Sequence, residues 1–348
     1  MPETITQLPG SLIREVANAG MARSDVLAFW FGESDEASPG AVRAAAIDSL
    51  TRGETFYSHN LGLTELREAL RRYTASLHPD PGADRIAVTS SGVSALMLAT
   101  QALISAGDEV VVVTPVWPNL PAQPTILGAH IRRVALRPDI NGAWQLDLQA
   151  LLDAITPKTR MLLVNAPNNP TGWTLSGTEQ QAVLDHCRRT GTWIVADEVY
   201  ERLWFGPGAA APSFLDIAHA DDRLIVTHSF SKSFLMTGWR LGWMVLPRGA
   251  LDGMAKLIEF NTSCAPVFVQ RAALAALTEA EHSVPALVQR MRLCRDTLCG
   301  ALSDLPGLRW HVPEGGMYVF LQVEGATDSL AFAKHLVAEH GLGLASWR

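Results

Sequence analysis

The strongest constraint on the fold is an alternation between short apolar runs and longer helical patterns over residues 85–246. Short runs rich in valine, isoleucine and leucine are typical of strands buried on both faces, and such strands belong to parallel sheets connected by helices. We therefore predict an α/β fold with a mostly parallel sheet covered by helices. The predicted strands are 86–89, 109–114, 161–165, 192–196, 223–228 and 241–246.

Helical patterns at 93–105 and 177–190 connect these strands, and the alternation thins out after about residue 265. Beyond that point, helical patterns surround a single short predicted strand at 317–323. This change indicates a second, smaller α+β domain with helices at 268–280, 284–302 and 328–340. We expect an N-terminal arm that joins the small domain (1–40), a large domain (41–264) and a C-terminal small domain (265–348).

Composition narrows the function classes. The chain has 348 residues with 35 acidic and 28 basic side chains, and its net charge of −7 disfavours nucleic acid as a partner. No apolar run approaches the roughly 18 residues that span a bilayer, and the first ten residues do not form a secretory signal. Four cysteines without metal-ligand spacing fit a reducing compartment. We expect a soluble, cytoplasmic enzyme without a metal site.

Polar residues follow several of the predicted strands. Asp197 and Tyr200 follow one strand, an Asn/Pro/Gly cluster at 165–172 follows another, and Lys232 and Arg240 follow a third. The first strand ends at Ser91 and Gly92, where a helix begins. Because ligands of open α/β sheets bind outside the carboxyl ends of the strands, we expect these residues to share one site.

The order and spacing of these motifs resemble those of the class I/II aminotransferases of fold type I, which depend on pyridoxal phosphate. The motifs are NPTG at 169–172, D-x-x-Y at 197–200, S-x-S-K at 229–232 and an arginine eight residues after the lysine. Each motif alone is weak, but four in this order on the expected strands are specific. The resemblance runs from about Gly32 to Gly341. It implies transfer of an amino group between an L-amino acid and a 2-oxo acid by a ping-pong scheme.

The resemblance assigns the central chemistry to Lys232, which would hold the cofactor aldehyde as a Schiff base and act as general acid and base. The chain has only four lysines. Lys158 lies in a polar turn, and the lysines at 256 and 334 lie on helical patterns that we interpret as solvated. A catalytic role therefore fits Lys232 better than a surface charge does.

The resemblance also implies which residues contact the cofactor ring. Asp197 would pair with the pyridine nitrogen, Tyr200 and Asn169 would donate to the phenolic oxygen, and Trp117 would stack on the ring. Asn169 would also face the substrate. Each has a structural alternative: a strand-end cap for Asp197, a turn for Asn169, and core packing for Tyr200 and Trp117.

For the cofactor phosphate, the resemblance implies backbone N–H groups at the helix start formed by Ser91, Gly92 and Val93, together with the side chains of Ser229 and Arg240. The alternatives are helix capping by Ser91 and a structural ion pair for Arg240.

Two further positions match the family. Tyr57 would reach the phosphate in the neighbouring subunit, which implies a homodimer, and Gly32 would lie near the substrate carboxylate. A loop aromatic and an ordinary turn are the alternatives for these two residues.

The chain departs from the family pattern at its C-terminus, where the family continues with a strand and an arginine that binds the substrate carboxylate. Arg348 does not stand in that motif, so we expect an apparently truncated small domain. Two other functions remain open on these residues: a C–S β-lyase on the same fold, and a cofactor-binding protein without catalysis. A DNA-binding regulator is disfavoured because no room precedes the first motif.

Overall fold

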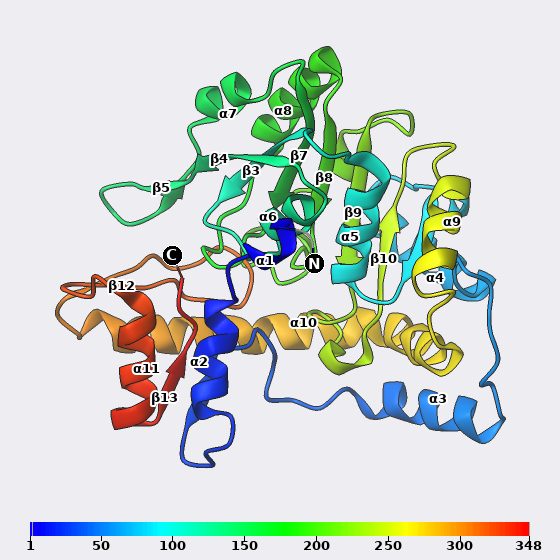
Figure 1. The fold of residues 1–348 in the computed structure, drawn as a ribbon. Coiled ribbons are helices and arrows are strands. Elements are labelled where there is room, and N and C mark those ends of the chain that lie inside the picture. Colours follow the sequence, from blue (N-terminus) through cyan, green and yellow to red (C-terminus); the bar gives the residue numbers. More distant parts are fainter. Residues whose placement is uncertain (2, 348) are drawn as a thin grey trace.

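A seven-stranded sheet forms the centre of the computed structural model, which describes residues 1 and 3–347 (Figure 1). The strand order is β2-β10-β9-β8-β7-β3-β4, and neighbours are parallel except that β10 is antiparallel to both β2 and β9. The α/β prediction is confirmed. The strands are β2 (Ile86–Thr89), β3 (Glu109–Thr114), β4 (His130–Ala135), β7 (Thr159–Asn165), β8 (Trp193–Asp197), β9 (Leu224–Ser229) and β10 (Gly242–Val245).

Both faces of the sheet are buried under helices because side chains alternate between the two faces of each strand. On β7, Leu162 and Val164 pack on one side with α7 and α8, whereas Met161 and Leu163 pack on the other side with α5, α6 and α9. These helices are α5 (Gly92–Leu103), α6 (Asn119–Ile126), α7 (Leu148–Ala154), α8 (Gly177–Thr190) and α9 (Leu251–Asn261). Such double coverage explains why the strands are continuous apolar runs in the sequence.

A single long helix, α10 (Val267–Ser303), replaces the two helices predicted at 268–280 and 284–302. The polar residues at 281–283, between the two predicted ranges, lie on its exposed or half-buried side, while Ala280 and Val284 continue the buried face. The prediction of two separate helices was wrong because polar residues on the solvent-facing side of an amphipathic helix do not interrupt it. Figure 1 shows α10 running along the base of the sheet, where it packs against α3 (Gly40–Thr51) and α4 (Thr64–Ala75).

The predicted strand 317–323 is also wrong in extent. Only Gln322–Val323 (β12) pairs, with β11 (Leu308–Arg309), and residues 317–321 lie outside any strand. The reason is that the preceding Gly315 and Gly316 are bonded through their backbone to the segment 203–205, far along the chain. That attachment directs the following residues toward the sheet edge instead of into a ladder.

The two ends of the chain meet in a separate layer. Strand β1 (Leu27–Phe29) is parallel to β13 (Leu342–Leu344), and Trp30 packs with side chains of α2 (Leu12–Gly20) and α11 (Ser329–His340). Figure 1 shows α2 beside β13 and α11. The remaining elements are short: a hairpin of β5 (Arg137–Pro138) and β6 (Trp144–Gln145), and the helix α1 (Glu3–Thr6). Three 3₁₀ turns join them: η1 (Ala83–Arg85), η2 (Phe214–Asp216) and η3 (Thr237–Trp239).

No helix in the described part of the chain is long and apolar enough to cross a membrane. The division into 1–40, 41–264 and 265–348 stays a prediction.

Candidate active site

One edge of the central sheet collects the polar residues that the sequence placed at strand ends. Strands β2, β7, β8 and β9 end at this edge, and the antiparallel β10 begins there, with Gly242 opposite both Thr89 and Ser229. In the same way, Asn165 at the end of β7 lies opposite Asp197 at the end of β8. The sheet register therefore brings residues from distant parts of the sequence into one site.

Lys232 lies in the turn after β9, and its side chain reaches the N-terminal segment. Its Nζ donates a hydrogen bond of 2.6 Å to the carbonyl oxygen of Gly32 and lies 5.4 Å from the centre of the Tyr200 ring. Burial lowers the pKa of Lys232 to about 8, although the negative charges of Asp197 and Glu33 oppose the shift. A large share of this amine is therefore neutral near pH 8, as a nucleophilic lysine requires.

The other lysines do not share this environment. Lys158 and Lys256 are exposed, and Lys334 forms an ion pair with Glu15 on the surface of the terminal layer.

Asp197 is the last residue of β8 and is buried, 3% exposed. Its Oδ1 has no hydrogen-bond partner among the described residues. Burial raises the pKa of Asp197 to about 7, although the Val199 backbone amide and the Lys232 charge oppose the shift. A buried carboxyl oxygen without a partner is costly in a folded protein, and such groups are characteristic of binding sites.

Asn169 and Tyr200 approach each other, and a third side chain, Tyr318, joins them. The Tyr200 and Tyr318 hydroxyls are 2.8 Å apart, and the Asn169 Nδ2 lies 3.2 Å from the Tyr318 hydroxyl and 3.5 Å from that of Tyr200. We call Lys232, Asp197, Asn169, Tyr200 and Tyr318 the central cluster.

The loops that carry the central cluster are fixed by buried hydrogen bonds. The Asn165 side chain accepts from the Asn169 backbone N–H at 2.7 Å and donates to the Asp197 carbonyl at 3.0 Å. The Trp117 backbone N–H donates to the Asn169 carbonyl at 2.9 Å, which brings this partly buried indole to the same loop. The amide of Asn165 thus ties the ends of two strands together.

The start of α5 lies against the ends of β9 and β10. Ser91 caps the helix by accepting from the Ser94 backbone N–H at 3.0 Å, and Gly92 and Val93 form the first turn. A Cβ atom at Gly242 would stand 2.5 Å from the Gly92 nitrogen, and one at Gly92 would stand 3.0 Å from the Ser229 Cβ. Glycines allow this close approach, which places the helix N-terminus beside Ser229.

Arg240 is exposed and lines a cavity of about 790 Å³ together with Ser90, Ser38 and Glu33. Its backbone is in the left-handed region, with φ of 54°, and its guanidinium donates to the Thr237 carbonyl at 2.6 Å. Arg240 makes no ion pair within the described residues. The structural ion pair considered for it is therefore not observed.

The Tyr57 side chain, by contrast with the buried residues of the central cluster, is 88% exposed.

The sequence analysis did not identify Tyr318. This residue fell inside the predicted strand 317–323, where a tyrosine has no special meaning. The Gly315–Gly316 pair before it was the available signal, because paired glycines often mark a close approach of two backbone segments.

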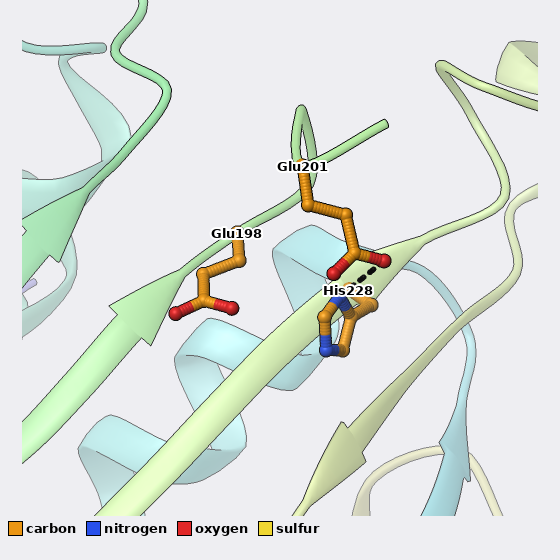
Figure 2. A group of neighbouring side chains, drawn as sticks. All are labelled: Glu198, Glu201 and His228. Carbon is orange, nitrogen blue, oxygen red and sulfur yellow. Dashed lines mark ion pairs between the residues drawn. The ribbon is translucent and has the colours of Figure 1, made fainter. Parts of the chain in front are cut away.

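A second buried group also escaped prediction. We call Glu198, Glu201, His78 and His228 the acidic network; Figure 2 shows three of its members, with His228 Nδ1 lying 3.5 Å from Glu201 Oε1. Glu198 accepts from the Ser213 hydroxyl at 2.5 Å and from the Phe214 backbone N–H at 3.1 Å. Glu201 lies 3.2 Å from His78 Nε2, so the carboxylates already have partners within the protein.

Charge in the acidic network is concentrated on one pair. Burial opposes a charged His78, but hydrogen bonds to Asp216 and Glu201 raise its pKa to about 10. Burial lowers the pKa of His228, which leaves that imidazole neutral, and burial raises the pKa of Glu198 to about 8. The pKa of Glu201 is lowered despite its burial because the imidazoles of His228 and His78 stabilise its charge. The charged pair within the network is therefore His78 and Glu201, and the His78 imidazolium also faces Asp216 at 2.7 Å.

Comparison with known proteins matches the site to a family. The model for aminotransferase class I and II matches residues 24–347. A probable aspartate aminotransferase of Methanocaldococcus jannaschii is 30% identical over 334 residues, which are 94% of this chain and 86% of that protein. An arginine–pyruvate transaminase of Pseudomonas aeruginosa is 32% identical, over 92% of this chain and 81% of that protein.

The fold agrees with a solved structure of the same kind. The crystal structure of an aspartate aminotransferase from Thermotoga maritima superposes with a TM-score of 0.90 at 30% identity, covering 99% of this chain and 90% of that one. The family model, the relatives and the fold agree over nearly the whole chain, and this protein therefore belongs to the class I and II aminotransferases, which depend on pyridoxal phosphate.

Proposed function

We propose that this aminotransferase performs both half-reactions at the central cluster, with an L-amino acid as donor and a 2-oxo acid as acceptor. The observation that carries the proposal is the position of Lys232. Its amine, whose pKa burial lowers to about 8, lies within hydrogen-bond distance of Gly32 and beside the ring of Tyr200, inside a cluster of buried polar groups.

The residues at the sheet edge fit pyridoxal phosphate. The unpartnered Oδ1 of Asp197 is a buried acceptor for the protonated ring nitrogen, and Asn169 and Tyr200 supply donors for the phenolic oxygen. The start of α5, with Ser91, Gly92 and Val93, offers backbone N–H groups to the phosphate, and Ser229 and Arg240 add side-chain donors. Trp117 would lie against the ring.

When bound, this cofactor supplies an electron sink that stabilises negative charge at the substrate Cα. Lys232 would hold the cofactor and, once the substrate amine displaces it, would accept the Cα proton at Nζ. Gly32 marks the substrate side of the site because its carbonyl already contacts that nitrogen. Asp197 would keep the ring nitrogen protonated, which needs its carboxyl ionised opposite a cation.

The visible absorbance spectrum tests the proposal. The purified protein with pyridoxal phosphate should show the band of lysine-bound cofactor, which bleaches with a mixture of amino acids and returns when a 2-oxo acid is added. A band that no amino acid changes would contradict the proposal. Release of pyruvate and ammonia from cystathionine without an oxo acid would indicate β-elimination instead.

We further propose that the active form is a homodimer in which each site uses Tyr57 of its neighbour. The support is the 88% exposure of Tyr57 beside the equally exposed Phe56, because adjacent exposed aromatic residues are typical of an interface.

Mixing two inactive variants tests the exchange of Tyr57. Lys232→Ala and Tyr57→Ala subunits should each be weakly active alone. After mixing and subunit exchange, hybrid dimers would contain one site with both defects and one intact site, so about a quarter of wild-type activity should return. Activity that stays at the level of the separate variants would mean that Tyr57 does not serve the neighbouring site.

We also propose that the protein works in a reducing compartment such as the cytoplasm. Its support is that Cys187, Cys264, Cys294 and Cys299 are all free thiols.

A further inference from the structure

Tyr318 occupies the middle of the central cluster without having been assigned a role. Its hydroxyl lies 2.8 Å from the Tyr200 hydroxyl and 3.2 Å from the Asn169 Nδ2, the two groups proposed to bind the cofactor's phenolic oxygen. The two phenol rings meet edge to face, with centres 5.9 Å apart and an angle of 75° between their planes. Tyr318 therefore contacts both proposed donors at once.

The backbone before Tyr318 is attached to the sheet edge on both sides of Gly315. The Phe205 N–H donates to the Glu314 carbonyl at 2.8 Å, and the Gly316 N–H donates to the Leu203 carbonyl at 2.7 Å. Because these bonds join segments more than a hundred residues apart, they fix the approach of the chain to the site.

Close packing adds to this attachment. A Cβ at Gly315 would stand 2.8 Å from the Pro167 Cβ, and a Cβ at Gly172 would stand 2.4 Å from the Pro313 Cβ. The segment before Tyr318 is thus pressed against the loop that carries Asn169. The main chain that carries Tyr318 is therefore fixed relative to that loop.

Tyr318 also limits the residue that faces Lys232. A Cβ at Gly32 would stand only 1.7 Å from the Tyr318 hydroxyl oxygen, so any larger residue at 32 would displace one of the two. Tyr318 therefore occupies the space that a side chain would need at the residue whose carbonyl accepts from Lys232 Nζ.

The hydrogen bonds among Tyr200, Tyr318 and Asn169 depend on which of these groups carries a proton to donate. Burial raises the pKa of Tyr318 to about 12 and raises that of Tyr200 well above its usual range, so both phenols are neutral at neutral pH. Asn169 Nδ2 can only donate and is 3.2 Å from the Tyr318 oxygen and 3.5 Å from the Tyr200 oxygen, so either phenol can give its proton to the other. When Tyr318 is the donor, the Tyr200 proton is free for a third acceptor.

Resting on the proposed function, we propose that Tyr318 is a positioning residue that donates a hydrogen bond to Tyr200 and directs the Tyr200 proton to the phenolic oxygen of bound pyridoxal phosphate. A phenol that accepts one hydrogen bond is a stronger donor in the next, because the bonds polarise one another. Tyr318 would thereby stabilise the ionised phenolic oxygen and favour loss of the proton from the lysine-bound nitrogen.

The test is the pH midpoint of the visible band of the cofactor-loaded protein, measured without substrate. Tyr318→Phe removes only the hydroxyl and should raise this midpoint by about 0.5 to 1 pH unit, the size expected for one hydrogen bond. Tyr200→Phe should raise it further, because it removes the direct donor. Tyr73→Phe, which removes a buried hydroxyl elsewhere in the fold, should leave the midpoint unchanged.

The outcomes separate the inference from the function on which it rests. A protein that forms no visible band would overturn the proposed function. A midpoint that moves with Tyr200→Phe but not with Tyr318→Phe would overturn the positioning role alone, and a midpoint that moves with neither would overturn it as well. Should the phenyl variant fail to fold, Tyr318→Leu removes the same donor and must shift the midpoint in the same direction.

Discussion

The stretch Asp197–Glu201 supplies carboxyl groups to two buried polar groups, and these carboxyl groups differ in whether the protein itself provides their partners. In the central cluster, Asp197 keeps a buried carboxyl oxygen without a partner. In the acidic network, the neighbouring Glu198 accepts hydrogen bonds at both oxygens, and Glu201 pairs with a charged His78. The two groups are adjacent in sequence and equally buried, so burial alone does not distinguish them.

This difference distinguishes a carboxyl group that can bind a ligand from one that stabilises the fold. A polar group whose partners are all within the protein stabilises the fold, whereas one without a partner lowers stability until a ligand supplies the partner. The carboxyl groups of the acidic network therefore hold the turn after β8 in place, although His228 Nε2 has no partner among the described residues, and the central cluster uses that turn. Exchanging a carboxyl for its amide in each group should give opposite results.

The largest effect is expected at Asp197. Asp197→Asn should lower turnover about 10²- to 10³-fold, because the ring nitrogen loses its ionic partner, while the free energy of unfolding of the cofactor-free protein does not fall. Glu198→Gln is the matched control: it should lower the unfolding free energy by about 1–3 kcal/mol and change turnover by less than about threefold. Steady-state kinetics and urea unfolding measure both. A fully active Asp197→Asn variant would contradict the assignment.

A smaller effect is expected at Glu201. Glu201→Gln removes the charge that faces His78 and should lower the unfolding free energy by about 3 kcal/mol, because it leaves a buried cation with fewer partners. Lys232 should still form its link to the cofactor in this variant. Urea unfolding measures the loss, and a variant as stable as the wild type would show that the pair contributes nothing.

The smallest effect, counted per pH unit, is expected at His78. Its pKa is raised from 6.5 to about 10 in the folded state, so the folded protein keeps a proton that the unfolded chain loses. The stabilisation is complete below pH 6.5 and is lost as the pH rises toward 10, with a slope of at most about 1.4 kcal/mol per pH unit. His78→Gln should flatten this part of the curve of unfolding free energy against pH. If the slope is unchanged in His78→Gln, a group other than His78 binds the proton that the folded protein retains.

The sequence predicted the central sheet well because its signal is local. The strands 86–89 and 109–114 match β2 and β3 residue for residue, and the other four predicted strands differ from the structure by at most two residues at either end. Strand β4 was missed because only Val134 of its six residues is buried, so it lacks the apolar run that marks the others.

The candidate site was predicted in part, and the omissions share a cause. Lys232, Asp197, Tyr200 and Asn169 stand at the ends of recognisable strands, so a spacing pattern could find them. Tyr318 reaches the site through backbone bonds to residues 203–205, and His78 reaches Glu201 across 123 positions. Such long-range contacts leave no periodic trace in the sequence.

The proposed chemistry depends most directly on which lysine holds the cofactor. We would reduce the cofactor-loaded protein with borohydride, digest it and locate the modified peptide by mass spectrometry; with only four lysines in the chain, the result is unambiguous. We expect the adduct on Lys232 and its absence in Lys232→Ala. An adduct on Lys158, Lys256 or Lys334 would contradict the assignment of Lys232.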